Sequence, residues 1–132
     1  MTGKHYVITG CLDWADEFDV HFFEILNEDE YNKYMIAKRV IGSFEGCYGF
    51  GSNEWFDEFD FLGFEPKEIT EEQYKFLNSI GVSGYKIFWK FMDIFEDARV
   101  DKGLEPANLY KASLDEFEKI CKEFVEVCKS GQ

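Results

Sequence analysis

The sequence predicts an α+β fold: an N-terminal antiparallel sheet of about three strands, with one intervening helix, packed on a C-terminal set of about three helices. Runs rich in β-branched and aromatic residues occupy the first part of the chain, whereas capping motifs and helical apolar spacing dominate after residue 66. The 132 residues contain no internal repeat and no linker. We therefore expect residues 1–132 to form a single domain.

The expected sheet begins with two strands, residues 5–12 and 18–26, joined by a turn at residues 14–17. Alternation gives the second strand two apolar faces, with Phe18, Val20, Phe22 and Glu24 on one and His21, Phe23 and Ile25 on the other. Such a strand is central, or has one face covered by helices. Residues 43–50 are the expected third strand. Residues 54–62 fit a helical and a strand pattern, and we favour a short helix or an ordered loop.

The intervening helix is predicted by its first turn. Asn27 is a good N-cap, and the next three residues, Glu28, Asp29 and Glu30, are carboxylates that complement the helix dipole. The helix should run to about Val40, with Gly42 as its stop.

Three later helices follow from caps and spacing. Thr70 and Ser113 each open a capping box, and Ser83 is the expected cap of the helix between them. The first should end near Gly81 and the second near Lys102. Apolar residues at helical spacing predict the buried faces of the second and third helices: Ile87, Phe88, Phe91, Ile94, Phe95 and Ala98, then Leu114, Phe117, Cys121, Phe124 and Cys128.

The charge of the chain is strongly one-sided. Its formal net charge is -13, and the first 65 residues hold fourteen carboxylates against four basic side chains. The remaining residues hold thirteen against ten. A folded domain with such a field attracts a basic partner and repels nucleic acid, so we expect no direct nucleic-acid binding.

Carboxylates and large aromatics occur together in the acidic half, and together they predict a partner-binding surface. On it, carboxylates would pair with basic side chains while Trp55 and Phe59 act as anchors. The predicted contact residues are Asp16, Glu17, Glu54, Trp55, Asp57, Glu58, Phe59 and Asp60. The alternative is an acidic surface that serves solubility alone, with the aromatics in the core.

No motif predicts catalysis, a metal or another cofactor. The two histidines, His5 and His21, lie in expected strands and are tied to no nucleophile. Acidic pairs three residues apart occur, but no calcium-loop sequence accompanies them. We expect no enzyme; a small metal-dependent enzyme that uses the acidic cluster remains a third hypothesis.

The four cysteines, Cys11, Cys47, Cys121 and Cys128, form no close pair and no zinc-like spacing. Reduced thiols in a cytoplasmic protein are expected. The chain has no signal-peptide pattern and no apolar run long enough to cross a membrane.

In size, charge and aromatic content the chain is similar to small acidic inhibitors made by bacteria and their phages. This likeness implies a cytoplasmic immunity protein that binds and neutralises a basic partner, a nuclease toxin domain. The alternative is a phage anti-defence protein that mimics nucleic acid and blocks a restriction or CRISPR nuclease. An exposed aromatic patch could also be a homodimer interface.

Overall fold

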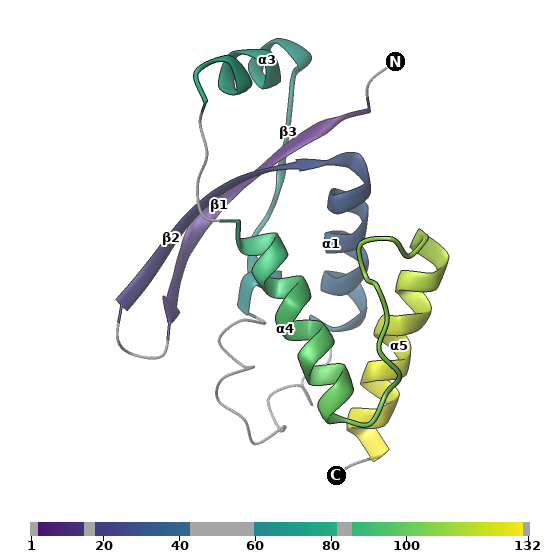
Figure 1. Ribbon diagram of the computed structural model, residues 1–132. Helices are drawn as coiled ribbons and strands as arrows, with labels where there is room; N and C mark the ends of the chain where they lie inside the picture. The colour runs from purple at the N-terminus through teal and green to yellow at the C-terminus, as the bar shows by residue number, and fades with distance from the viewer. Residues whose placement is uncertain (1–2, 15–17, 43–59, 82–85, 131–132) are drawn as a thin grey trace.

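The computed structural model describes residues 3–14, 18–42, 60–81 and 86–130, and within them it has the α+β fold that the sequence predicts (Figure 1). Three strands, four α-helices and one short 3-10 helix follow each other along these parts of the chain. In chain order they are β1 (His5–Trp14), β2 (Phe18–Asn27), α1 (Glu28–Val40), η2 (Asp60–Gly63), β3 (Lys67–Ile69), α3 (Glu71–Ser79), α4 (Ile87–Asp101) and α5 (Leu114–Ser130).

The sheet is antiparallel, in the order β2-β1-β3. Strands β1 and β2 form a hairpin of ten residue pairs, from His5 opposite Asn27 to Trp14 opposite Phe18. Strand β3 pairs with the start of β1, where Ile69 lies opposite His5. Residues 67–69 were not among the expected strands, because three residues are too few to show a strand pattern. The expected strand at residues 43–50 lies outside the described residues.

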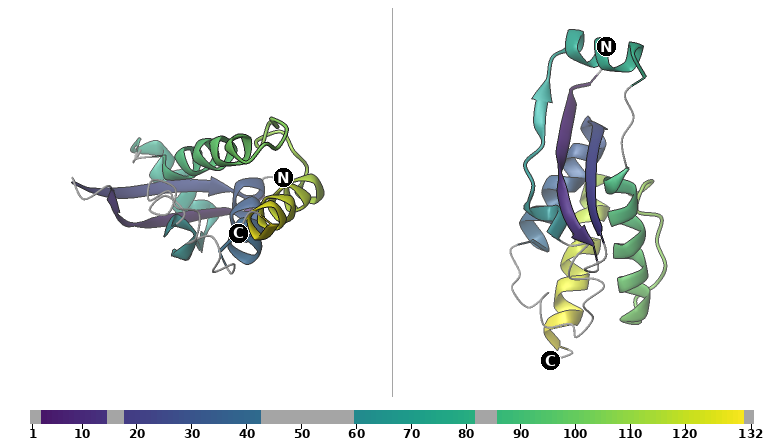
Figure 2. Two further views of the ribbon diagram at one scale, coloured as in Figure 1. Left: turned by 90° about the horizontal axis from the view of Figure 1, so that it is seen from below. Right: turned by 90° about the vertical axis from the view of Figure 1, so that its left-hand side faces the viewer.

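One face of the hairpin, the inner face, is buried. Tyr6 and Leu26 are opposite each other on it, as are Ile8 and Glu24, and all four side chains are at most 8% exposed. Helix α1 lies behind the sheet with α5 packed along it, and α4 lies beside β2 (Figure 2). Phe95 of α4 joins these helices because its ring contacts those of Phe117 and Phe124 of α5. The predicted apolar stripes of α4 and α5 are thus confirmed as core, except for Ile94 and Leu114, which are half-buried.

The predicted caps are confirmed at three helices. Asn27 and Glu30 form a capping box at α1, as do Thr70 and Gln73 at α3. Ser113 and Glu116 exchange the same pair of hydrogen bonds at the start of α5. In each box, two amides that have no partner inside the helix are satisfied by side chains, which fixes where the helix begins.

The expected start of α4 at Ser83 is wrong. The helix begins at Ile87, and its N-cap residue Lys86 makes no side-chain capping bond. Instead, the carboxylate of Glu24 on β2 accepts a hydrogen bond of 2.7 Å from the amide of Phe88. A long-range contact therefore replaces the local cap, and local sequence could not reveal it. The end of α4 is as predicted, with Gly103 in the left-handed region at φ 87°.

Two buried cations tie the segment between α4 and α5 to the core. Lys33 of α1 is 1% exposed and donates to the carbonyl of Tyr110 at 2.7 Å. Arg99 of α4 is 2% exposed, pairs with Glu96 and donates to the carbonyl of Glu105. A buried charge is tolerated because it is paired and hydrogen-bonded.

Gly10 is required on the inner face because the ring of Phe64 lies against it. A Cβ at position 10 would lie 2.6 Å from Cδ1 of Phe64 and 3.0 Å from Cζ of Phe22. The carbonyl of Phe64 accepts hydrogen bonds from Tyr34 and Lys38, so its backbone is anchored. Gly10→Ala should lower the free energy of unfolding by about 1–3 kcal/mol, measured by urea denaturation.

The matched control is Gly63→Ala in η2. A Cβ there would meet nothing within 4 Å, so its unfolding free energy should stay close to that of the wild type. Equal stability of the two variants would show that Phe64 moves aside without cost.

Candidate functional site

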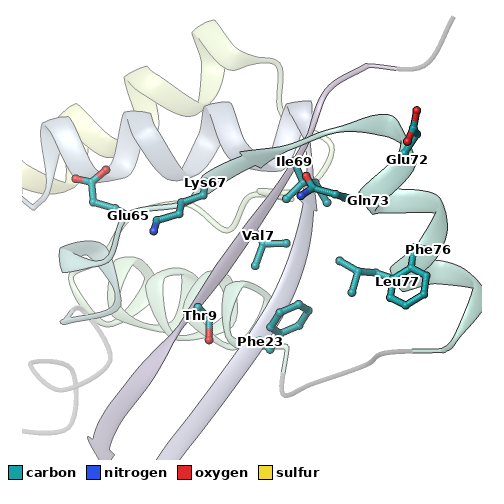
Figure 3. Close-up of a pocket in the computed structure, with 10 residues that line it drawn as sticks. All are labelled: Val7, Thr9, Phe23, Glu65, Lys67, Ile69, Glu72, Gln73, Phe76 and Leu77. Carbon is teal, nitrogen blue, oxygen red and sulfur yellow. The ribbon is translucent and has the colours of Figure 1, made fainter.

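The outer face of the sheet is only partly covered, and it forms a groove with α3. Val7 and Thr9 of β1 and Phe23 of β2 form the floor, while Phe76 and Leu77 of α3 form a wall (Figure 3). The remaining lining residues are Glu65, Lys67, Ile69, Glu72 and Gln73. Its volume is about 700 Å³. We call this feature the outer-face groove.

Helix α3 stands apart from the other helices, across one end of the sheet (Figure 2). None of its residues is buried, and Phe76 is 61% exposed. Ile80, directly after the helix, is 56% exposed. The helix is held by its capping box and by Tyr74, whose ring stacks on that of His5 with centroids 3.6 Å apart. The amphipathic pattern of α3 therefore presents apolar side chains to the groove and to solvent.

The rim of the groove is polar and carries more negative than positive side chains. Two carboxylates, Glu65 and Glu72, line it together with one ammonium, Lys67. Glu65 also pairs with Lys38 of α1 at 3.0 Å, although its side chain remains 74% exposed. An apolar centre with a polar rim is the arrangement of protein-binding surfaces.

Each basic side chain of the acidic half is engaged in an ion pair within the protein. Lys4 pairs with Glu68, Lys33 with Asp29, Lys38 with Glu65 and Arg39 with Glu118, at 3.7, 3.2, 3.0 and 2.9 Å. These cations each neutralise a carboxylate of the chain itself. The first 65 residues therefore have no further basic side chain to neutralise their excess of carboxylates.

Most of the predicted contact residues lie outside the described residues: Asp16, Glu17, Glu54, Trp55, Asp57, Glu58 and Phe59. Asp60 begins η2, and its side chain also lies outside the described part. The hairpin register places Asp13 opposite Asp19, and this pairing brings one acidic residue of each strand to the same end of the sheet. Glu24 of β2 lies away from that end, opposite Ile8.

The sequence prediction missed the outer-face groove, although two signals pointed to it. The alternation of β2 gives it a second apolar face, which includes Phe23. The helix after Thr70 carries Phe76 and Ile80. Nothing in the sequence indicated that α3 would stand beside that face without covering it.

The candidates for acid–base chemistry are dispersed or structurally engaged. His5 stacks on Tyr74, and His21 lies 3.9 Å from the thiol of Cys11 on the exposed face of the hairpin. Cys121 and Cys128 are buried on the apolar face of α5, as predicted, and burial raises the pKa of Cys128 to about 11. In the parts of the chain that the structure describes, no three His, Cys, Asp or Glu side chains could together hold a metal ion.

Glu24, among the described residues, is a buried carboxylate with a raised pKa, and a functional role has to be considered for it. Burial raises its pKa from 4.5 to about 7, and the hydrogen bond from Phe88 partly opposes that rise. Perturbed carboxylates often mark active sites. Glu24, however, lies on the inner face and not in the outer-face groove, and its hydrogen bond serves the first turn of α4. We interpret it as a structural residue.

Glu24 should make stability depend on pH. Because its pKa is higher in the folded than in the unfolded chain, its stabilising contribution is complete below pH 4.5 and is lost as pH rises to about 7. Glu24→Gln keeps an acceptor for Phe88 but does not titrate. Relative to wild type, its free energy of unfolding should rise between pH 4.5 and 7, by at most about 3 kcal/mol, in urea denaturation. Glu126→Gln, at an exposed position of α5, is the control. A pH profile of Glu24→Gln parallel to that of wild type would contradict the assignment.

None of the helices that the structure describes combines the length and the apolar character needed to span a bilayer. Comparison with known proteins adds no relative, since no family model, no curated protein and no solved structure matches the chain.

Proposed function

We propose that this protein is a non-enzymatic inhibitor that binds a basic protein partner and occludes its working surface, in the manner of a cytoplasmic immunity protein bound to a nuclease toxin domain. The observation that carries this proposal is the concentration of negative charge in the first 65 residues. This part of the chain has fourteen carboxylates and only four basic side chains. All four of those cations are already paired inside the fold.

Two physical consequences support a protein partner. A one-sided acidic field accelerates the encounter with a basic surface and disfavours acidic or nucleic-acid partners. Charge alone gives modest affinity, so a tight inhibitor also needs apolar anchors that become buried on binding. Phe76 on α3 and Ile80 directly after it are exposed and available for that purpose.

The first test is capture of partners from lysate of the source organism on the immobilised protein, at low and at high salt, followed by mass spectrometry. A basic protein should be retained at low salt and weakened at high salt, because the attraction between surface charges is screened. A toxin nuclease among the retained proteins would identify an immunity protein, whereas a restriction or CRISPR nuclease would identify an anti-defence protein. Retention of no basic protein would overturn the proposal.

Charge reversal tests the predicted acidic surface on the captured partner. Asp57→Lys with Glu58→Lys should weaken binding about tenfold or more and reduce its salt dependence, measured by calorimetry at several salt concentrations. Asp97→Lys with Asp101→Lys on exposed positions of α4 changes the net charge equally and is the matched control. Equal loss in both variants would mean that only the total charge matters.

A further inference from the structure

We infer that the outer-face groove is the anchor site of this interaction: it accepts apolar side chains from a short segment of the partner that is flanked by Lys or Arg. The inference rests on the proposed function, since it assigns the basic partner a docking position. It names a surface that the sequence prediction did not include.

The groove has the size and lining that an apolar anchor requires. About 700 Å³ of space lies between the sheet and α3, and Val7, Phe23, Ile69, Phe76 and Leu77 supply apolar walls. Figure 3 shows the side chain of Leu77 extending from α3 toward the floor of the groove, with the ring of Phe76 beside it on the helix. One or two aliphatic or aromatic side chains of a partner would be desolvated there, as hot-spot residues are.

Helix α3 is stabilised little by buried contacts with the rest of the protein. This indicates that another molecule covers its apolar side. A helix of nine residues is marginal by itself and normally depends on burying an apolar face. Here no residue of the helix is buried, and Phe76 remains largely exposed. A partner that covers this side chain would remove its apolar surface from water, which favours binding.

Charge decides which occupant fits. Glu65 and Glu72 lie on the rim with Lys67, and Glu65 stays 74% exposed although it pairs with Lys38. The floor is formed by strands of the acidic half, and the whole chain carries a net charge of -13. A segment with Lys or Arg beside its apolar anchor would be attracted by this field and would place a positive charge near Glu72. A second copy of this chain would also carry a net charge of -13, so electrostatic repulsion opposes a homodimer through this groove.

The test is selection of peptides from a random phage-displayed library on the intact protein at 150 mM salt, roughly physiological ionic strength. Enriched peptides should combine one or two large apolar residues with Lys or Arg. Their affinities are then measured as synthetic peptides by fluorescence polarisation. Phe76→Ser should weaken them about tenfold or more, because it removes a wall of the groove. Val100→Ser, an equally simple truncation of an exposed apolar residue on α4, should leave them unchanged.

A second pair of variants tests the rim. Glu72→Lys should weaken the Lys- or Arg-bearing peptides more than Glu126→Lys, which changes the net charge equally on distant α5. Peptides that bind Phe76→Ser as tightly as wild type are held by charge alone, and would overturn the inference. Lack of enrichment, or enrichment of acidic or uncharged peptides, would also overturn it.

Sedimentation of the wild type and of Phe76→Ser tests the remaining possible occupant of the groove, a second copy of this chain. A wild-type dimer that Phe76→Ser converts to monomer would show that a second copy fills the groove, and would overturn the inference. The capture experiment tests the proposed function separately. A captured basic protein whose binding is insensitive to Phe76→Ser leaves the inhibitor intact and refutes only the groove as its anchor.

Discussion

The pairing of β1 with β2 is the constraint on which the rest of the structure depends. Ten consecutive residue pairs fix which side chains share a face, because a shift by one residue would exchange the two faces completely. This register puts Gly10 under the ring of Phe64 and Glu24 beside the first turn of α4. The position of α4 and the path of the chain after η2 therefore follow from the hairpin.

The protein core shows how this fold accommodates buried charge. Glu24, Lys33 and Arg99 are all buried, and each makes a hydrogen bond to a backbone group of a distant segment or loop. Removing such a partner leaves a buried polar group unsatisfied, which costs more than the bond contributes. These three side chains thus specify how α4 and the segment before α5 are arranged.

The outer face shows the opposite behaviour, since apolar side chains of the sheet and of α3 face a space that the fold leaves open. Lys33 and Lys38 neutralise two carboxylates of the acidic half, yet a large excess of carboxylate remains there. Open apolar surface and excess negative charge are costly for an isolated domain. Both would be relieved by one basic partner with an apolar anchor, which is why the two proposals address the same event.

Sequence alone was enough to predict the α+β class, the two long strands, the N-cap of α1, the capping boxes of α3 and α5, and most of the buried stripes of α4 and α5. These features depend on neighbours within a few residues, so periodicity and caps reveal them. Three features could be seen only in the folded protein: the three-residue strand β3, the start of α4 at Ile87 and the position of α3 beside the outer face. Each depends on groups far apart in the chain: His5 with Ile69, Glu24 with Phe88, and Tyr74 with His5. Local sequence carries no signal for such pairings, because they exist only once the hairpin has brought the segments together.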